Sequence, residues 1–271
     1  MRLGTILLGC TLLVAGCGGG SSSPNPTPPP PGGGTVDQAI EVSVFNAAKP
    51  IDGNYSGKIN VNASITSKEE TKSFDNLVTN LGLGEQNSQN LTWVQTNESP
   101  VANSKLSTTV LDADSGQTLG TQETEVANGA HQQVYLVGQS DKSLQAVLVA
   151  APSLSELNDP LNSNQFAISV VHAYTPGSSL VVDVYFTHGI RDKIGDKVGF
   201  GERGAVTAVT AQPGADRIIV TDANLAPDFG NPANNLGSFD EQNLQAGKHY
   251  QIVVTEAADS SAPKLHIITL D

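Results

Sequence analysis

Histidine residues offer the first candidates for chemistry, because imidazole is the commonest metal ligand and titrates near neutral pH. His131 and His249 occupy equivalent positions in two similar segments, each at the start of an expected strand. A zinc site needs three or four convergent donors, and neither histidine has a second His or Cys at ligand spacing. The pattern therefore favours partly exposed strand histidines and predicts no metal site.

His172 and Asp183 form a second candidate pair, because a carboxylate hydrogen-bonded to imidazole orients the ring. The two side chains could meet across neighbouring strands of the second half. Two interpretations remain open, an acid–base pair and a hydrogen bond that pins two strands together, of which the second is favoured. The first half has Asn46 and Asn60 at these positions, which can hydrogen-bond but cannot do acid–base work.

Asp112 and Asp114 precede Gly116 with the alternating spacing that opens a calcium loop. The later acidic ligand is missing at the expected spacing unless Glu123 or Glu125 folds back. A hairpin turn around Gly116 is the favoured interpretation, and a calcium site is the weaker one.

Motifs and net charge argue against several classes of function. The chain contains no G-x-S-x-G, H-E-x-x-H, P-loop or dinucleotide motif, so serine hydrolases, zincins, NTPases and oxidoreductases lose their usual sequence support. We therefore expect no cofactor and no catalytic residue. The chain has 14 Lys and Arg against 27 Asp and Glu, a formal net charge of -13 that repels phosphate backbones and argues against nucleic acid.

The N-terminus has the pattern of a targeting segment. The apolar run from Leu3 to Val14 is shorter than the roughly 20 residues that span a bilayer and suits the core of a signal peptide. It ends in LVAGC, which resembles the lipobox of bacterial lipoproteins and places the lipidated cysteine at Cys17. Cys10 is the other cysteine of the chain, so the mature protein has no disulfide partner. By resemblance to enteric lipoproteins, Gly18 in place of Asp favours the outer membrane.

The two halves of the chain share four short segments in the same order, which indicates duplication of one unit. The matching segments are Val42–Ala47 with Ile168–Ala173, Ile59–Val61 with Val182–Val184, Gly82–Glu85 with Gly199–Glu202, and Gly129–Val134 with Gly247–Ile252. Short alternating or β-branched apolar runs between Gly, Pro, Asn and Asp predict strands. We therefore predict an all-β fold of two tandem immunoglobulin-like antiparallel β-sandwiches. The exception is Ser67–Leu81, whose apolar residues share a helical face and predict a short helix.

The second half resembles domain-of-unknown-function family 4397, immunoglobulin-like domains of bacterial surface and secreted proteins. The resemblance rests on FAISVVHAYTP from Phe166, VDVY from Val182 and AGKHY from Ala246. The first half departs from the pattern, with Asn46, Asn60 and Gln132 in place of the family's His, Asp and Tyr. The resemblance implies a fold and a location and assigns no catalytic residue.

Composition divides the chain into five segments. We expect a signal peptide at 1–16, the lipidated cysteine with a flexible Pro/Gly/Ser linker at 17–35, a first sandwich at 36–151, an inter-domain linker at 152–164 and a second sandwich at 165–271. Leu154 and Leu157 predict one helical turn that docks between the domains. We expect fragments Thr35–Ala151 and Ser163–Asp271 to fold separately.

These features predict a palmitate-anchored protein of the bacterial cell envelope that acts as a non-catalytic binding, adhesion or structural module. Its expected partners are the membrane, through the N-terminal lipid, and an envelope or extracellular protein or a glycan. The alternative is an enzyme or solute-binding protein with its site in the 222–243 loop or between the domains, because long loops on β scaffolds often carry function.

Overall fold

The computed structural model describes residues 35–50, 53–68, 70–96, 103–139, 143–188, 190–211, 217–231, 235–240, 243–256 and 262–270. The predicted signal peptide, Cys17 and the linker as far as residue 34 lie outside these residues. Residues 34–271 form one compact unit. The described residues contain strands and two single 3-10 turns but no α-helix, which confirms the all-β prediction. None of the described helical segments is long and apolar enough to cross a bilayer.

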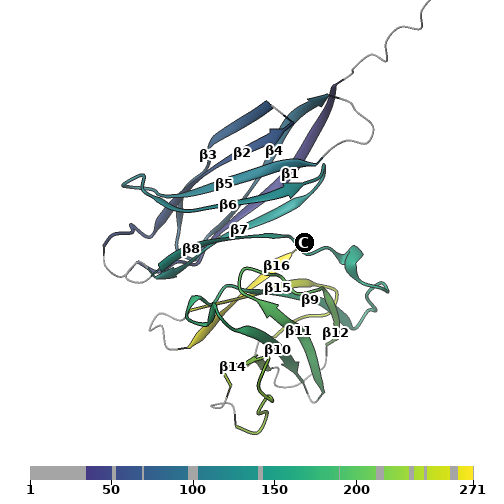
Figure 1. Ribbon diagram of the computed structural model, residues 1–271. Helices are drawn as coiled ribbons and strands as arrows, with labels where there is room; N and C mark the ends of the chain where they lie inside the picture. The colour runs from purple at the N-terminus through teal and green to yellow at the C-terminus, as the bar shows by residue number, and fades with distance from the viewer. Residues whose placement is uncertain are drawn as a thin grey trace, which may run out of the picture. The chain divides into compact units, whose positions relative to one another are not determined.

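The first repeat is a sandwich of two four-stranded sheets (Figure 1). Its strands are β1 (Thr35–Asn46), β2 (Lys58–Ser67), β3 (Glu70–Gly82), β4 (Gln86–Thr96), β5 (Ser104–Asp112), β6 (Thr118–Val126), β7 (His131–Gln139) and β8 (Ser143–Ala150). One sheet has the order β4-β1-β7-β8 and the other β3-β2-β5-β6.

The second repeat has the same plan. Its strands are β9 (Gln165–His172), β10 (Val181–Thr187), β11 (Arg191–Gly199), β12 (Thr207–Thr210), β13 (Arg217–Asp222), β14 (Gly237–Asp240), β15 (His249–Glu256) and β16 (Pro263–Leu270). The sheets β12-β9-β15-β16 and β11-β10-β13-β14 match those of the first repeat strand for strand. The prediction of two tandem β-sandwiches built from one duplicated unit is confirmed.

Each sandwich contains one parallel strand pair among its antiparallel pairs. β1 pairs with β7 in parallel, and β9 pairs with β15 in the same way. In each repeat one sheet contains the first, fourth, seventh and eighth strands, and the other contains the second, third, fifth and sixth. A constant-type immunoglobulin domain instead has seven strands, divided between the sheets ABED and CFG. The sandwiches are thus mixed sheets with their own strand order.

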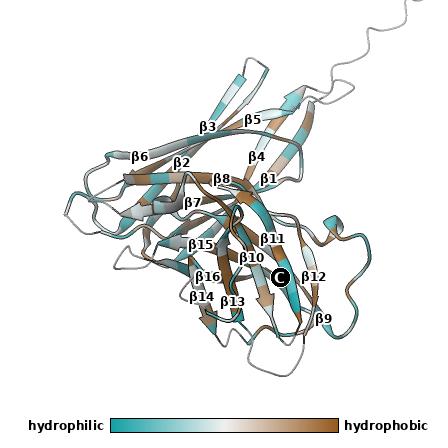
Figure 2. Cartoon of the chain, turned by 60° about the horizontal axis from the view of Figure 1, so that its bottom comes forward, coloured by the Kyte–Doolittle hydropathy of each residue, from teal (hydrophilic) through white to brown (hydrophobic). Residues whose placement is uncertain are grey.

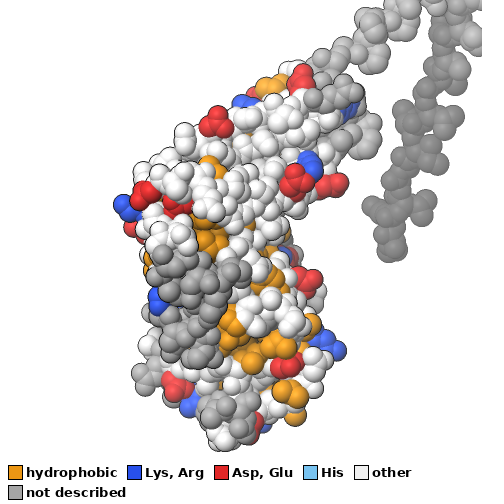
Figure 3. Space-filling model, turned by 60° about the vertical axis from the view of Figure 1, so that its left-hand side comes forward, with side chains coloured by type: hydrophobic (Ala, Val, Ile, Leu, Met, Phe, Trp, Pro, Cys, Tyr) orange, Lys and Arg blue, Asp and Glu red, His pale blue; other side chains and the backbone are white. Residues whose placement is uncertain are grey.

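Each repeat has its own hydrophobic core between its two sheets. Alternation places Val42 and Val44 of β1 inside the first sandwich, and Val182 and Val184 of β10 inside the second. In Figure 2 the brown, hydrophobic stretches lie in strands such as β13. On the face seen in Figure 3, hydrophobic side chains gather over the second sandwich and are fewer over the first.

The short helix predicted at Ser67–Leu81 is wrong, because Ser67 ends β2 and the segment from Glu70 onward belongs to the bulged strand β3. Register shifts against β2 lie on both sides of Val61. Asn76 and Asn80 have φ values of 54° and 53°, and their N–H groups donate to the side chains of Asn62 and Asn60 of β2. The extra residues space the inward-facing side chains of β3 three and four apart, which imitates the face of a helix.

The segment between Asp222 and Asn243 is also not a continuous loop, because it contains β14. Phe229, which precedes β14, packs edge-on against Tyr185 at 5.3 Å, and the Arg191 guanidinium lies 4.1 Å from the centre of the Phe229 ring. These contacts hold the segment against the sheet that contains β10.

The connection between the sandwiches contains the predicted turn, as a 3-10 turn over Leu154–Glu156 capped by Ser153. The expected docking through leucine is wrong, since Leu154 is 48% exposed. Arg203 of the second sandwich holds the turn instead, donating to both carboxylate oxygens of Glu156 at 3.0 Å and to the Ala150 carbonyl at 2.9 Å.

Candidate functional site

The two sandwiches meet through the outer faces of equivalent sheets. Phe45, Tyr135 and Val137 of the first repeat pack in one apolar cluster with Val171 and Val253 of the second. These residues alternate with the inward-facing core residues of the same strands, so the sheets that contain β1 and β9 are covered on both faces.

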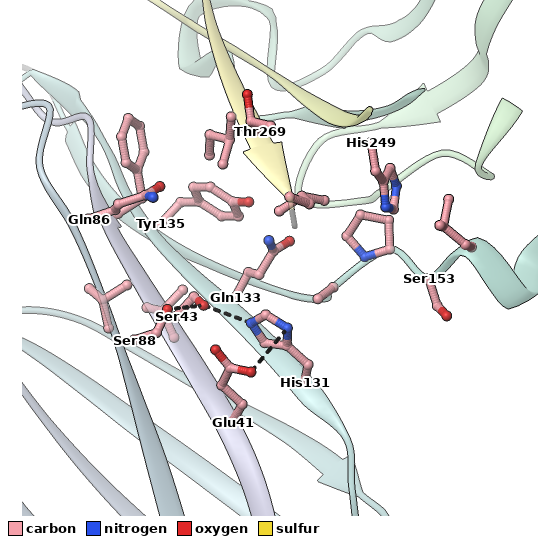
Figure 4. A pocket seen from close by; sticks show the side chains of 18 of the residues that line it. Glu41, Ser43, Gln86, Ser88, His131, Gln133, Tyr135, Ser153, His249 and Thr269 are labelled. Carbon is pink, nitrogen blue, oxygen red and sulfur yellow. Dashed lines mark hydrogen bonds and ion pairs between the residues drawn. The ribbon is translucent and has the colours of Figure 1, made fainter. Parts of the chain in front are cut away.

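A cleft of about 990 Å³ lies beside this cluster and is lined by both repeats (Figure 4). The first repeat contributes β1, β4 and β7, and the second contributes the end of β16 and the turn before β15. Pro152, Ser153 and Leu154 of the connection complete the lining. The cleft is the candidate functional site, because proteins usually bind small ligands in concave sites that are largely pre-formed.

A chain of hydrogen-bonding side chains crosses the first-repeat wall of the cleft. Ser88 Oγ lies 2.7 Å from Ser43 Oγ, which lies 2.7 Å from His131 Nε2. On the other side of the ring, Nδ1 lies 3.7 Å from Glu41 Oε2. Figure 4 shows these residues together, with dashed lines along Ser43, His131 and Glu41. We call these four residues the polar row.

Strand register explains the polar row. Glu41 and Ser43 are alternate residues of β1 and therefore share its outer face. Pairing sets Ser88 of β4 opposite Ser43 on one side, and His131 of β7 opposite Glu41 on the other. The side chains of His131 and Glu41 are 33% and 42% exposed, so a ligand in the cleft can reach them.

Ser43, His131 and Glu41 follow one another as the serine, histidine and carboxylate of a hydrolase triad do. Their distances can therefore be compared with those that a triad requires. A triad requires the carboxylate to hold Nδ1 by a hydrogen bond, and 3.7 Å is too long for one. It also requires donors aimed at an oxyanion, whereas β1 is an inner strand whose backbone is paired on both sides. This geometry does not match a triad, and the row offers hydrogen-bonding groups to a ligand in the cleft.

His249 brings the second predicted histidine to the same cleft (Figure 4). Burial lowers the pKa of its imidazole, and Nε2 has no hydrogen-bond partner among the described residues. Ser169, the counterpart of Ser43, is likewise buried with an unpartnered hydroxyl, and Ala167 stands opposite His249 where Glu41 stands opposite His131. The second repeat thus retains serine and histidine without the exposed row.

The other predicted pair, His172 and Asp183, lies on β9 and β10, which belong to different sheets, so the expected meeting across neighbouring strands is wrong. His172 is fully buried, accepts the N–H of Tyr174 at Nδ1 and packs edge-on against Phe200. Asp183 accepts hydrogen bonds on the outer face of its sheet from Lys193 Nζ, the Tyr185 hydroxyl and the N–H of Lys197.

Asp112 is the last residue of β5, and its side chain holds the turn that follows. Its carboxylate accepts the N–H of Ser56 and both the N–H and the hydroxyl of Ser115. Burial raises its pKa, but these hydrogen bonds outweigh burial and hold the pKa below its usual value. Asp114 is exposed in the same turn. The described residues contain no group of three or more His, Cys, Asp or Glu side chains placed to hold a metal ion.

Comparisons with known proteins identify no family for the chain. No family model and no curated protein matches the chain. Solved structures similar to it include a candidate cell adhesion protein from Bacteroides uniformis (9% identity, 87% of this chain and 97% of that chain, TM-score 0.26). Others are the CBM26 module of Eubacterium rectale Amy13K with maltoheptaose (10%, 86% and 98%, 0.23) and the tip fimbrial protein Mfa3 of Porphyromonas gingivalis (7%, 87% and 100%, 0.24). Likenesses of this size carry no argument about function.

Proposed function

We propose that the protein is a lipid-anchored, non-catalytic binding module of the bacterial cell envelope that takes its ligand in the cleft between the repeats. The polar row carries this proposal. It presents two hydroxyls, an imidazole and a carboxylate in one line on a rigid sheet, which suits a ligand with several hydrogen-bonding groups.

The anchor and the location are further parts of the proposal. The LVAGC sequence at Cys17 and the Pro/Gly/Ser linker support attachment to a membrane through acyl chains, and Gly18 supports the outer membrane. The resemblance of the second half to family 4397 supports a surface or secreted role. A net charge of -13 supports a neutral or basic ligand in preference to an anionic one.

The ligand class is open between a glycan and a peptide, and the cleft favours hydrogen bonding over ring stacking. Trp93, the single tryptophan, is 4% exposed and donates its indole N–H to Ser67 Oγ at 3.1 Å, so it offers no stacking surface. Tyr135 lines the cleft but is also buried, with its hydroxyl bonded to Gln251.

Glycan and peptide arrays probed with the labelled mature chain test the proposal. Ligands bound by the wild type should be lost with Ser43→Ala and His131→Ala. They should be retained with Thr109→Ala, a hydroxyl removal on the outer face of the sheet that contains β5. Ligands retained equally by all three variants would overturn the site, and no bound ligand on either array would overturn the binding function.

A further inference from the structure

The outer edge of β16 differs from its counterpart in the first repeat. There β6, nine residues long, covers the edge of β8, since Gln122 Nε2 donates to the Ala146 carbonyl at 2.9 Å. Gly120 allows the approach, because a Cβ at this position would lie 2.9 Å from Ala146 N. In the second repeat the equivalent strand β14 has four residues and approaches β16 at Pro263, where a Cβ at Gly237 would lie 2.7 Å from the Pro263 Cγ. Among the described residues no strand pairs with the outer edge of β16 or of β8.

This difference leaves part of the second core open. Ala146 of β8 is 6% exposed, whereas its counterpart Leu265 on β16 faces the second core and remains only partly buried. Ile267 is partly buried, as is its counterpart Leu148 on β8. β16 begins with Pro263 and Lys264, residue types that protect exposed edges, but from Leu265 to Leu270 it has no Asp, Glu, Lys or Arg.

We propose that the outer edge of β16 is a docking surface on which an extended segment of a partner polypeptide adds as a fifth strand of the sheet. An edge strand presents N–H and C=O groups at the strand repeat, and only another extended chain matches all of them. Apolar side chains at alternate positions of the segment would cover Leu265 and Ile267. This surface is additional to the proposed ligand site at the polar row.

Charge decides between a partner segment and a second copy of the chain. Two copies, each with a net charge of -13, repel at long range, and the single charged side chain of β16, Lys264, cannot offset this. The same charge attracts a segment flanked by basic residues. The occupant is therefore a neutral or basic extended segment with alternating apolar residues.

A strand fused to the chain tests whether the outer edge of β16 can accept a fifth strand. The mature chain is extended after Asp271 with an Asn-Gly turn and the strand Val-Thr-Val-Thr-Val, and the control extension carries proline at both threonine positions. Amide hydrogen exchange within Leu265–Leu270 should slow by about fivefold or more with the valine–threonine strand and not with the control. Equal exchange in both proteins would overturn the proposal.

Fluorescent peptides added in trans test the partner chemistry. A Val-Thr-Val-Thr-Val peptide flanked by lysines should bind the mature chain more tightly than one flanked by glutamates, and the intramolecular strand should abolish binding. His131→Ala should bind it normally, which separates this surface from the cleft. Absent or charge-independent binding would overturn the partner assignment. A dimer in sedimentation that the added strand dissolves would assign the edge to a second copy instead.

Discussion

Gln133 and Gln251 occupy the same position in the two repeats and hydrogen-bond to each other, Gln251 Nε2 donating to Gln133 Oε1 at 2.7 Å. Gln251 Oε1 accepts from the Tyr135 hydroxyl at 2.6 Å, and all three side chains are buried. The repeats thus meet through equivalent faces, and this polar contact fixes how the apolar residues around it align. Gln133 and Tyr135 also line the cleft, whose two walls belong to different repeats.

Replacing Gln251 tests this contact. Gln251→Ala removes the partner of Tyr135 and of Gln133 and leaves buried polar groups unsatisfied, so we expect the free energy of unfolding to fall by about 2–3 kcal/mol. Gln89→Ala, on the exposed face of β4, should change it by less than about 0.5 kcal/mol. Urea unfolding measures both, and equal effects of the two changes would contradict the role given to Gln251.

His266 makes stability depend on pH. It packs edge-on against Phe45 at 5.1 Å, and burial, aided by nearby Lys264, lowers its pKa to about 4. The unfolded chain protonates this histidine near its ordinary pKa of about 6.5, so the folded state loses stability as pH falls from about 6.5 to 4. Unfolding measured across this range should show a decline that His266→Gln reduces. An NMR titration of the ring with a midpoint near 6.5 would contradict the assignment.

Arg203 should control the order of the connection between the repeats. Its guanidinium binds the Glu156 carboxylate through two hydrogen bonds, a geometry that lysine cannot reproduce. We therefore expect Arg203→Ala and Arg203→Lys alike to speed amide exchange in Leu154–Leu157, by about tenfold if the lost pair contributes about 1.4 kcal/mol. Full protection in the lysine variant would show that charge alone is sufficient.

Cys17 should carry the lipid. Cells that express the full chain in radiolabelled palmitate should label it, and Cys17→Ser should abolish the label while Cys10→Ser should retain it. Because several acyl chains bind a bilayer far more firmly than none, the Cys17→Ser protein should also leave the membrane fraction. Labelling that persists without Cys17 would refute the anchor.

The sequence predicted the strands and their duplication because both depend on local patterns. Alternation along β1 and β10 and the repeated Gly-x-Gly-Glu turns needed no partner to be recognised. In both turns the glutamate accepts the N–H of the first glycine, Glu85 from Gly82 and Glu202 from Gly199. The prediction of a helix in place of β3 failed because the bulges at Asn76 and Asn80 depend on hydrogen bonds to side chains of β2. The spacing of apolar residues within one segment cannot reveal such a partner strand.

The cleft could be predicted only in part. His131 and His249 were singled out from the repeat, and both line it. Glu41, Ser43 and Ser88 were missed, because their meeting with His131 requires the parallel pairing of β1 with β7 and the register of β4, both non-local. The signal available in the sequence was the alternation of polar Glu41 and Ser43 with the apolar residues Ile40, Val42 and Val44.

The most direct test of ligand binding in the cleft is an NMR titration of the isotope-labelled mature chain with a ligand recovered from the arrays. The account predicts that the largest amide shifts fall on Ser43, Ser88 and His131, and that His131→Ala weakens binding by about tenfold or more, as expected for loss of a hydrogen bond to a charged or strongly polar group. Shifts confined to the 222–243 segment or to the outer edge of β16, with His131→Ala binding normally, would contradict it.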